Sequence, residues 1–162
     1  MPNAIFFYRV SRWFYLHKIP LIPSLIQGLI FILYNCHISY KANIGKGTFL
    51  FHKGIATLIH NNVIIGTNCR IGMSVMITGK SPYKNVPQIG NNVMISPGAV
   101  ISGPVIIEDN VIVAPNAIVI RSVPAGAIIG GVPAKIIGWV KNLNNNILKN
   151  ESWNEEYMEY LK

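Results

Sequence analysis

The chain has 162 residues, enough for one domain with short appendages and too few for two full-sized domains. Hydrophobic residues make up 51% of it and charged residues only 12%, a composition that excludes intrinsic disorder. Fourteen basic and six acidic residues give a formal net charge of +8, and no acidic residue precedes Glu108. A mechanism that needs a carboxylate from the first two thirds of the chain is therefore excluded.

Two helices are predicted in an N-terminal segment, residues 1–36, at about residues 5–17 and 21–35. Pro20 and Pro23 separate them, because proline interrupts a helix in its interior. The apolar stretch of residues 19–34 is interrupted and shorter than the roughly twenty apolar residues of a membrane-spanning helix. We therefore expect neither a membrane span nor a cleaved signal peptide.

Two roles for these helices are open. Arg9, Arg12 and Lys18 alternate with aromatic residues, a mixture that suits peripheral contact with a membrane surface. The alternative is that the helices pack against the rest of the protein or against a partner subunit. Cys36 and Cys69 form neither a disulfide framework nor a metal-binding spacing, which fits a reducing compartment. We expect a cytoplasmic protein, at the inner face of the membrane if the helices bind lipid.

An aliphatic residue recurs every six positions from Ile38 to Val119, with longer spacings of nine after Leu50 and twelve after Ile77. A period of six fits neither a β-strand, whose period is two, nor an α-helix, whose period is 3.6. The thirteen positions all carry Ile, Leu or Val: Ile38, Ile44, Leu50, Ile59, Ile65, Ile71, Ile77, Ile89, Ile95, Ile101, Ile107, Val113 and Val119.

Smaller residues follow the same period. Four positions after twelve of the aliphatic residues comes a mostly small side chain: Ala42, Thr48, Gly54, Val63, Cys69, Val75, Val93, Ala99, Val105, Val111, Ala117 and Val123. Gly or Asn, which tolerate left-handed backbone, often stands three positions after: Gly47, Asn62, Asn68, Asn92, Gly98, Asn110 and Asn116. The pattern predicts an all-β coil of short parallel strands whose inward side chains stack into ladders.

This repeat, followed by GVPAK at residues 131–135, resembles the hexapeptide-repeat acyltransferases. The resemblance covers residues 36–138 and is closest to the serine acetyltransferases and their shorter relatives from polysaccharide gene clusters. It implies a left-handed parallel β-helix over residues 37–138, a hand that the period alone does not determine. A linker and a C-terminal helical tail are predicted in residues 139–162.

The resemblance places the catalytic general base at His52. O-acetylation requires a hydroxyl to attack a thioester, and a neutral imidazole can take the hydroxyl proton. His60 and His37 are further candidates. Serine acetyltransferases have an aspartate at the position of His37, so the ring of His52 must be held by a backbone carbonyl, by His37, or by an acid from the tail or a neighbouring subunit. The spacings of fifteen and eight between these three histidines do not match zinc-dependent β-helix enzymes, and we expect no metal.

The resemblance also implies acetyl-CoA as co-substrate and a homotrimer, with the pantetheine arm in a groove between two subunits. The matching positions are Gly79, Ser96, Pro97, Ala114, Pro115 and Lys135. Small residues let the thin arm approach the backbone, and a lysine can meet the CoA phosphates.

The acceptor side departs from the serine acetyltransferases. This chain has Phe51 in place of an aspartate, Asn85 in place of an arginine and Val86 in place of a histidine. We therefore expect a carbohydrate acceptor, a sugar hydroxyl of a surface polysaccharide or its precursor, bound by Phe51, Tyr83 and Asn85. The alternatives are serine O-acetylation and a non-catalytic β-helix assembly module. No basic and aromatic face recurs along the coils, so no nucleic acid partner is expected.

Overall fold

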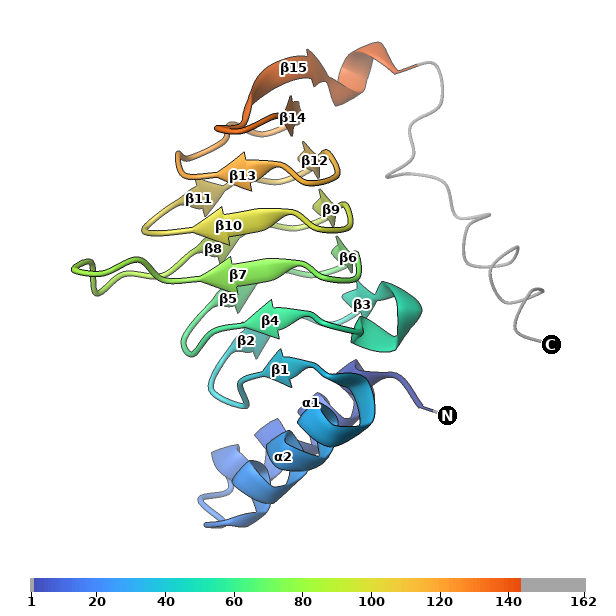
Figure 1. Cartoon of the computed structure of the whole chain (residues 1–162), viewed down its shortest axis with the longest axis vertical. Helices are drawn as coiled ribbons and strands as arrows, with labels where there is room; N and C mark the ends of the chain where they lie inside the picture. Colours follow the sequence, from blue (N-terminus) through green and yellow to red (C-terminus); the bar gives the residue numbers. More distant parts are fainter. Residues whose placement is uncertain (1, 144–162) are drawn as a thin grey trace, which may run out of the picture.

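The computed structural model describes residues 2–143. The chain begins with a hairpin of two helices and continues as a stacked coil of short strands (Figure 1). Helix α1 spans Ala4–Leu16 and helix α2 spans Ile22–Tyr34, so both predicted helices are confirmed to within one residue at each end. Asn3 begins α1 by accepting a hydrogen bond from the backbone N–H of Ile5 at 3.1 Å.

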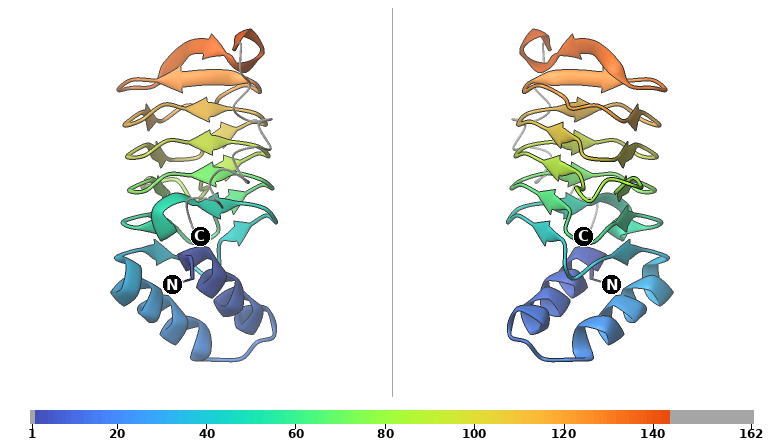
Figure 2. Two further views of the ribbon diagram at one scale, coloured as in Figure 1. Left: turned by 90° about the vertical axis from the view of Figure 1, so that its right-hand side faces the viewer. Right: turned by 90° about the vertical axis from the view of Figure 1, so that its left-hand side faces the viewer.

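Three sheets form the three sides of the coil (Figures 1 and 2). Sheet A contains β1 (His37–Ile38), β4 (Leu58–Ile59), β7 (Met76–Thr78), β10 (Val100–Ser102) and β13 (Ile118–Val119). Sheet B contains β2 (Asn43–Ile44), β5 (Ile64–Ile65), β8 (Gln88–Ile89) and β11 (Ile106–Ile107). Sheet C contains β3 (Phe49–Leu50), β6 (Arg70–Ile71), β9 (Met94–Ile95), β12 (Ile112–Val113), β14 (Ala127–Gly130) and β15 (Lys135–Trp139).

The chain climbs as a left-handed coil. In Figure 1 it runs from right to left along the strands of sheet A and returns from left to right behind them. Within residues 2–143 every strand pairing is parallel except that of β14 with β15. Four coils contribute a strand to each sheet, and the fifth contributes β13 and β14. The predicted all-β parallel β-helix is therefore confirmed.

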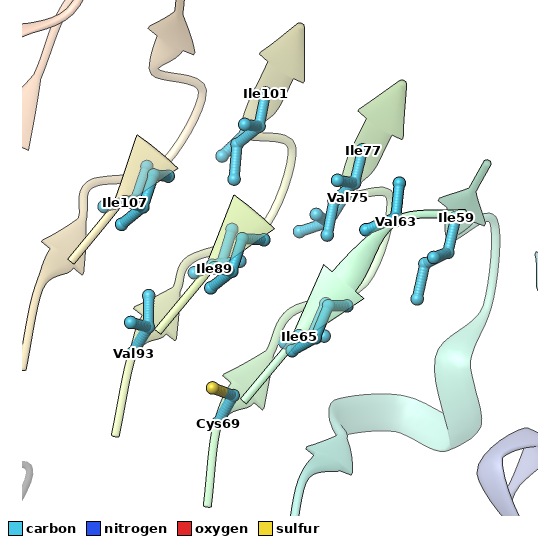
Figure 3. Close-up of a cluster of buried hydrophobic side chains, with 14 of the residues drawn as sticks. Ile59, Val63, Ile65, Cys69, Val75, Ile77, Ile89, Val93, Ile101 and Ile107 are labelled. Carbon is cyan, nitrogen blue, oxygen red and sulfur yellow. The ribbon is translucent and has the colours of Figure 1, made fainter. Parts of the chain in front are cut away.

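The core of the coil consists of the repeat positions. All thirteen aliphatic positions are buried, each with at most 4% of its surface exposed, and the twelve smaller positions are buried with them. Figure 3 shows Ile65, Ile89 and Ile107, which come from successive coils of sheet B, in one row. The seven predicted corner residues all have positive φ, between 53° and 76°. One coil alone could not enclose such a row, so each coil depends on its neighbours for burial.

Helix α1 covers the open edge of the first coil, where no coil lies below to pair with the main chain. The buried hydroxyl of Tyr8 donates a hydrogen bond to the carbonyl of Ala42 at 2.8 Å and accepts one from the N–H of Ile44 at 3.2 Å. Arg9 donates to the carbonyl oxygens of Ile44 and Gly45. Side chains of α1 thus satisfy backbone groups that a further strand would otherwise pair with.

Arg12 completes this end cap. Its guanidinium donates to the carbonyl oxygens of Tyr40 and Ala42, at 3.2 and 2.5 Å. Burial raises the pKa of the Tyr8 phenol above its usual value, while the nearby Arg12 lowers it, so the phenol is protonated at neutral pH. Both arginines therefore pack against the protein, which is the second of the two roles predicted for the helices. No helix within residues 2–143 is long and apolar enough to cross a membrane.

The upper end of the coil closes differently. Strand β15 runs antiparallel to β14 and is followed by the short 3₁₀ helix η2 (Val140–Asn142). The predicted C-terminal helical tail lies outside the described residues, and the domain boundaries at residues 36 and 138 stay predictions.

The two cysteines are buried in the core and are free. Burial raises the pKa of the Cys36 thiol to about 12 and also raises that of Cys69. Both side chains are therefore neutral thiols at physiological pH and serve as small apolar core residues.

We expect Tyr8→Phe to lower the free energy of unfolding by about 1–3 kcal/mol, because it leaves the buried N–H of Ile44 without a partner and removes one of the two hydrogen bonds to the carbonyl of Ala42. Urea unfolding would measure the loss. Tyr15→Phe is the matched control, since Tyr15 is 40% exposed and its hydroxyl has no hydrogen-bond partner within residues 2–143. Equal stability of the two variants would contradict the capping role of Tyr8.

Candidate active site

Two additions interrupt the regular coil. In sheet A, Leu58 pairs with Met76 and Val100 pairs with Ile118, and the partners in each pair are 18 positions apart. His37 and Leu58 are instead 21 positions apart, and Met76 and Val100 are 24 apart. The first addition contains a short 3₁₀ turn, η1 (Phe51–Gly54), between β3 and β4. The second is the loop of residues 79–87 between β7 and β8. Extra residues in a repeat are the natural place for a functional site, because they are free of the packing that the repeat requires.

These additions lie at different edges of the coil. Corner CA is formed by the turns that lead from sheet C to sheet A, residues 51–57, 72–75, 96–99 and 114–117. Corner AB is formed by the turns that lead from sheet A to sheet B, residues 39–42, 60–63, 79–87 and 103–105. In Figure 1, η1 projects at the right and the loop after β7 projects at the left.

Corner CA brings together most of the residues predicted to bind CoA, one above another. Ser96 and Pro97 follow β9, and Ala114 and Pro115 follow β12 in the next coil. The backbone N–H of Ser96 donates a hydrogen bond to the carbonyl oxygen of Val113 in the next coil, at 3.0 Å.

The coils approach one another closely at corner CA. A Cβ atom on Gly72 would lie 2.6 Å from the backbone nitrogen of Pro97, so this position admits only glycine. Gly130 stands at the top of the same corner, where its added Cβ would lie 3.2 Å from that of Ala114. Lys135 pairs with Gly130 across β14 and β15 and is exposed. The corner is therefore a column of small residues and main chain with a lysine at its upper end.

His52 stands at the foot of this column. It has φ 50° and ψ 38°, and Lys53 has φ 61°, so two consecutive non-glycine residues are left-handed. Such a backbone is strained and persists only where its surroundings hold it, which is common at functional sites. The side chain of His52 is exposed. Phe51 stands beside it, and its ring contacts that of Phe49 edge to face at 5.5 Å.

The ring of His52 has no hydrogen-bond partner within residues 2–143. His37, at the start of β1, is exposed as well, and its ring also lacks a partner in this part of the chain. Neither a backbone carbonyl nor His37, two of the partners expected from the sequence, holds His52 within these residues. In the same described residues no three His, Cys, Asp or Glu side chains converge as metal ligands.

Corner AB contains a pocket of about 340 Å³. Its walls come from His60 and the loop of the following coil: Thr78, Gly79, Lys80, Ser81, Pro82, Tyr83, Lys84 and Val86. Gly79 and Tyr83, predicted for cofactor and acceptor, thus lie with His60 and away from Ser96 and Ala114. Asn85 is exposed and does not line the pocket.

One hydrogen bond of His60 favours a particular arrangement of its ring protons. Its Nδ1 lies 3.1 Å from the carbonyl oxygen of Asn61. Because a carbonyl only accepts, the contact favours the proton on Nδ1 and leaves Nε2 as an acceptor. Lys80 and Lys84 make the pocket basic. The repeat pattern does not predict this property, but the absence of acidic residues before Glu108 was a signal for it.

The predicted site residues are therefore divided between two edges of one chain. The strands of sheet A separate corner CA from corner AB, and each strand of two or three residues spans about 7–10 Å before the corners are added. His52 and the pocket beside His60 therefore lie at the two opposite edges of sheet A.

Comparisons with known proteins agree with the fold. Residues 87–121 match the family described as bacterial transferase hexapeptide (six repeats). The chain is 33% identical over 137 residues to the serine acetyltransferase of Synechococcus elongatus, a match that covers 83% of this chain and 56% of that protein. It is 36% identical over 137 residues to the serine acetyltransferase of Synechocystis, covering 83% and 55%.

Solved structures give the same result. The crystal structure of serine acetyltransferase from Brucella abortus in complex with coenzyme A superposes with a TM-score of 0.80 at 26% identity, covering 84% of this chain and 55% of that one. The chain spans about half the length of the relatives that it matches.

The repeat, the three parallel sheets and these similarities define a left-handed β-helix acyltransferase fold. The chain belongs to the hexapeptide-repeat transferase family, with serine acetyltransferases among its relatives.

Proposed function

We propose that the chain is a subunit of an O-acetyltransferase that uses acetyl-CoA. The observation that carries this proposal is corner CA, where an exposed histidine on a strained turn stands at the foot of a column of small residues. The similarity to serine acetyltransferases, one of them solved with coenzyme A, supports it. A non-catalytic assembly module would not need the strained turn at His52.

The pantetheine arm would lie along corner CA. Four coil spacings of about 4.8 Å separate the level of His52 from that of Gly130 and Lys135, a rise of about 19 Å. An extended arm is of similar length. Its amides would bond to main-chain groups of the corner near Ser96 and Ala114, and Lys135 would meet the phosphates.

In the reaction His52 would act as general base. Its imidazole takes the proton of the acceptor hydroxyl while the hydroxyl oxygen attacks the thioester carbonyl. Backbone N–H groups would stabilise the oxyanion of the tetrahedral intermediate. The C–S bond then breaks, the acceptor ester is released, and the proton from the imidazole passes to the sulfur to give CoA.

A homotrimer would complete the site, since one chain separates His52 from the pocket at His60. The outward positions of sheet A support contact between copies, because Leu58, Met76 and Val100 are apolar where a fully solvated sheet face would be polar. With threefold symmetry, corner CA of one subunit would face corner AB of the next, so that three equivalent sites form.

Two acceptors are candidates. Serine is the one that the names of the relatives support, and they do not support the sugar hydroxyl expected from the sequence. One observation keeps a sugar as the second candidate: within residues 2–143 the only carboxylates are those of Glu108 and Asp109. Both acids lie in the fourth coil, away from His52, where they accept hydrogen bonds from the N–H groups of Ala125 and Asn91. The ammonium group of serine would need its acidic partner from outside this part of the chain.

The acceptor is identified by release of CoA thiol from acetyl-CoA. We expect release to require an acceptor and to be saturable with serine if the chain follows its relatives. Saturation by a sugar or oligosaccharide with no response to serine would select the second candidate. Absence of release with either class, by a correctly assembled protein, would contradict the acetyltransferase function.

His52→Ala should lower turnover by about 10²–10⁴-fold while acetyl-CoA binding stays near that of the unchanged protein, because only proton transfer is lost. Steady-state kinetics and calorimetric titration measure the two quantities. His17→Ala is the control, since His17 lies at the end of α1, stacked on Trp13. Retained activity of His52→Ala together with loss in His60→Ala would transfer the role of base to His60.

Subunit mixing tests the shared site. We expect trimers reassembled from equal amounts of His52→Ala and a loop variant, Tyr83→Ala with Lys84→Ala, to recover activity in about one site in four, because that fraction combines an intact corner CA with an intact corner AB. A site contained in one chain would recover nothing on mixing. The result is read against each variant reassembled alone.

A further inference from the structure

Helix α2 presents a continuous face of large apolar side chains that nothing within residues 2–143 covers. Leu21, Leu25 and Ile32 are 77%, 71% and 80% exposed. The name α2 apolar face is used below for the exposed side chains of Leu21, Leu25, Leu29, Phe31, Ile32 and Leu33. The opposite side of the helix, with Ile30 and Tyr34, is buried. Solvent-exposed apolar patches of this kind mark an interaction surface.

The helical end of the molecule, to which this face belongs, is cationic. Lys18 lies in the turn between α1 and α2, and the helix itself carries no charged residue. Lys41 and Lys46 are exposed in turns of the first coil. These turns adjoin α1, whose arginines donate hydrogen bonds to the carbonyl oxygens of Ala42 and Gly45. The described carboxylates all lie in the fourth coil, away from the helical end (Figure 1).

We infer that the α2 apolar face binds an anionic lipid surface. Such a surface offers apolar chains to Leu25 and Ile32 and negative headgroups to the lysines. A second copy of this end would complement the apolar side chains but would oppose lysine to lysine, with no acid in residues 2–107 of either copy to pair with them. Trp13, 52% exposed on α1, is a residue type that favours the boundary between lipid and water.

The shape of the molecule permits this contact. The helix hairpin projects beyond β1 at the foot of the coil (Figures 1 and 2), whereas corners CA and AB run up its sides. A subunit standing on its helices would leave both corners open to solutes. The inference does not depend on the proposed acetyl transfer, and lipid binding is measured without it.

Cosedimentation with vesicles tests the inference on the full chain. Vesicles of phosphatidylcholine alone are compared with vesicles that also contain phosphatidylglycerol. We expect the protein to bind the anionic vesicles at least tenfold more tightly than the neutral ones, and added salt to weaken the binding. The double variant Leu25→Glu with Ile32→Glu should bind at least tenfold more weakly, because both changes place a charge in the contact.

Ile137→Glu is the matched control. Ile137 is 66% exposed on β15, at the other end of the coil, and its change should leave vesicle binding unaltered. Circular dichroism must show native structure in both variants, which is expected because the altered side chains are exposed. Three results would overturn the inference: no binding to anionic vesicles, equal binding by the double variant, or equal binding to neutral vesicles. Light scattering could give a fourth such result. If the assembly of the unchanged protein had twice the mass of that of the double variant, the face would be assigned to contact with a second copy.

Discussion

The hydrogen bonds that join each coil to the next are the constraint on which the rest of the structure depends. Bonds such as Gly66 N to Ile89 O at 2.8 Å and Gly90 N to Ile107 O at 2.7 Å hold the coils one strand spacing apart. At that spacing the inward positions must be filled by branched aliphatic side chains. Only the turns can gain residues without disrupting the ladder, and for this reason both additions lie at corners.

The same constraint shapes the candidate site. Stacked coils place corresponding turns directly above one another, so a ligand that lies along the axis meets the same corner in every coil. Corner CA offers it glycine, serine and alanine, and the main chains of successive coils approach closely there. Chemistry therefore depends on one irregular turn at the end of the column, where His52 leaves the regular pattern.

Much of this architecture could be predicted from the sequence because each coil repeats the same requirement. Ile38 and Val119 meet the same packing condition eighty-one residues apart, and Asn62 or Asn116 turns its corner by the same left-handed φ. The surroundings of His60 could not be predicted, since no periodicity governs the loop that carries Lys80 and Lys84 above it. Nor could the bonds of Tyr8 to the first coil, which depend on how a helix docks at the end of a repeat.

The two ends of the coil have a consequence for the behaviour of the protein at high concentration. A stack of parallel strands with bare ends is a template on which further chains can add, as in a fibril. Here the lower end is occupied by the side chains of α1, and at the upper end β15 reverses direction over sheet C. The first coil beneath α1 and the upper edge of sheet C therefore do not offer the parallel ladder that another copy would need to continue, which opposes end-to-end growth at these two places.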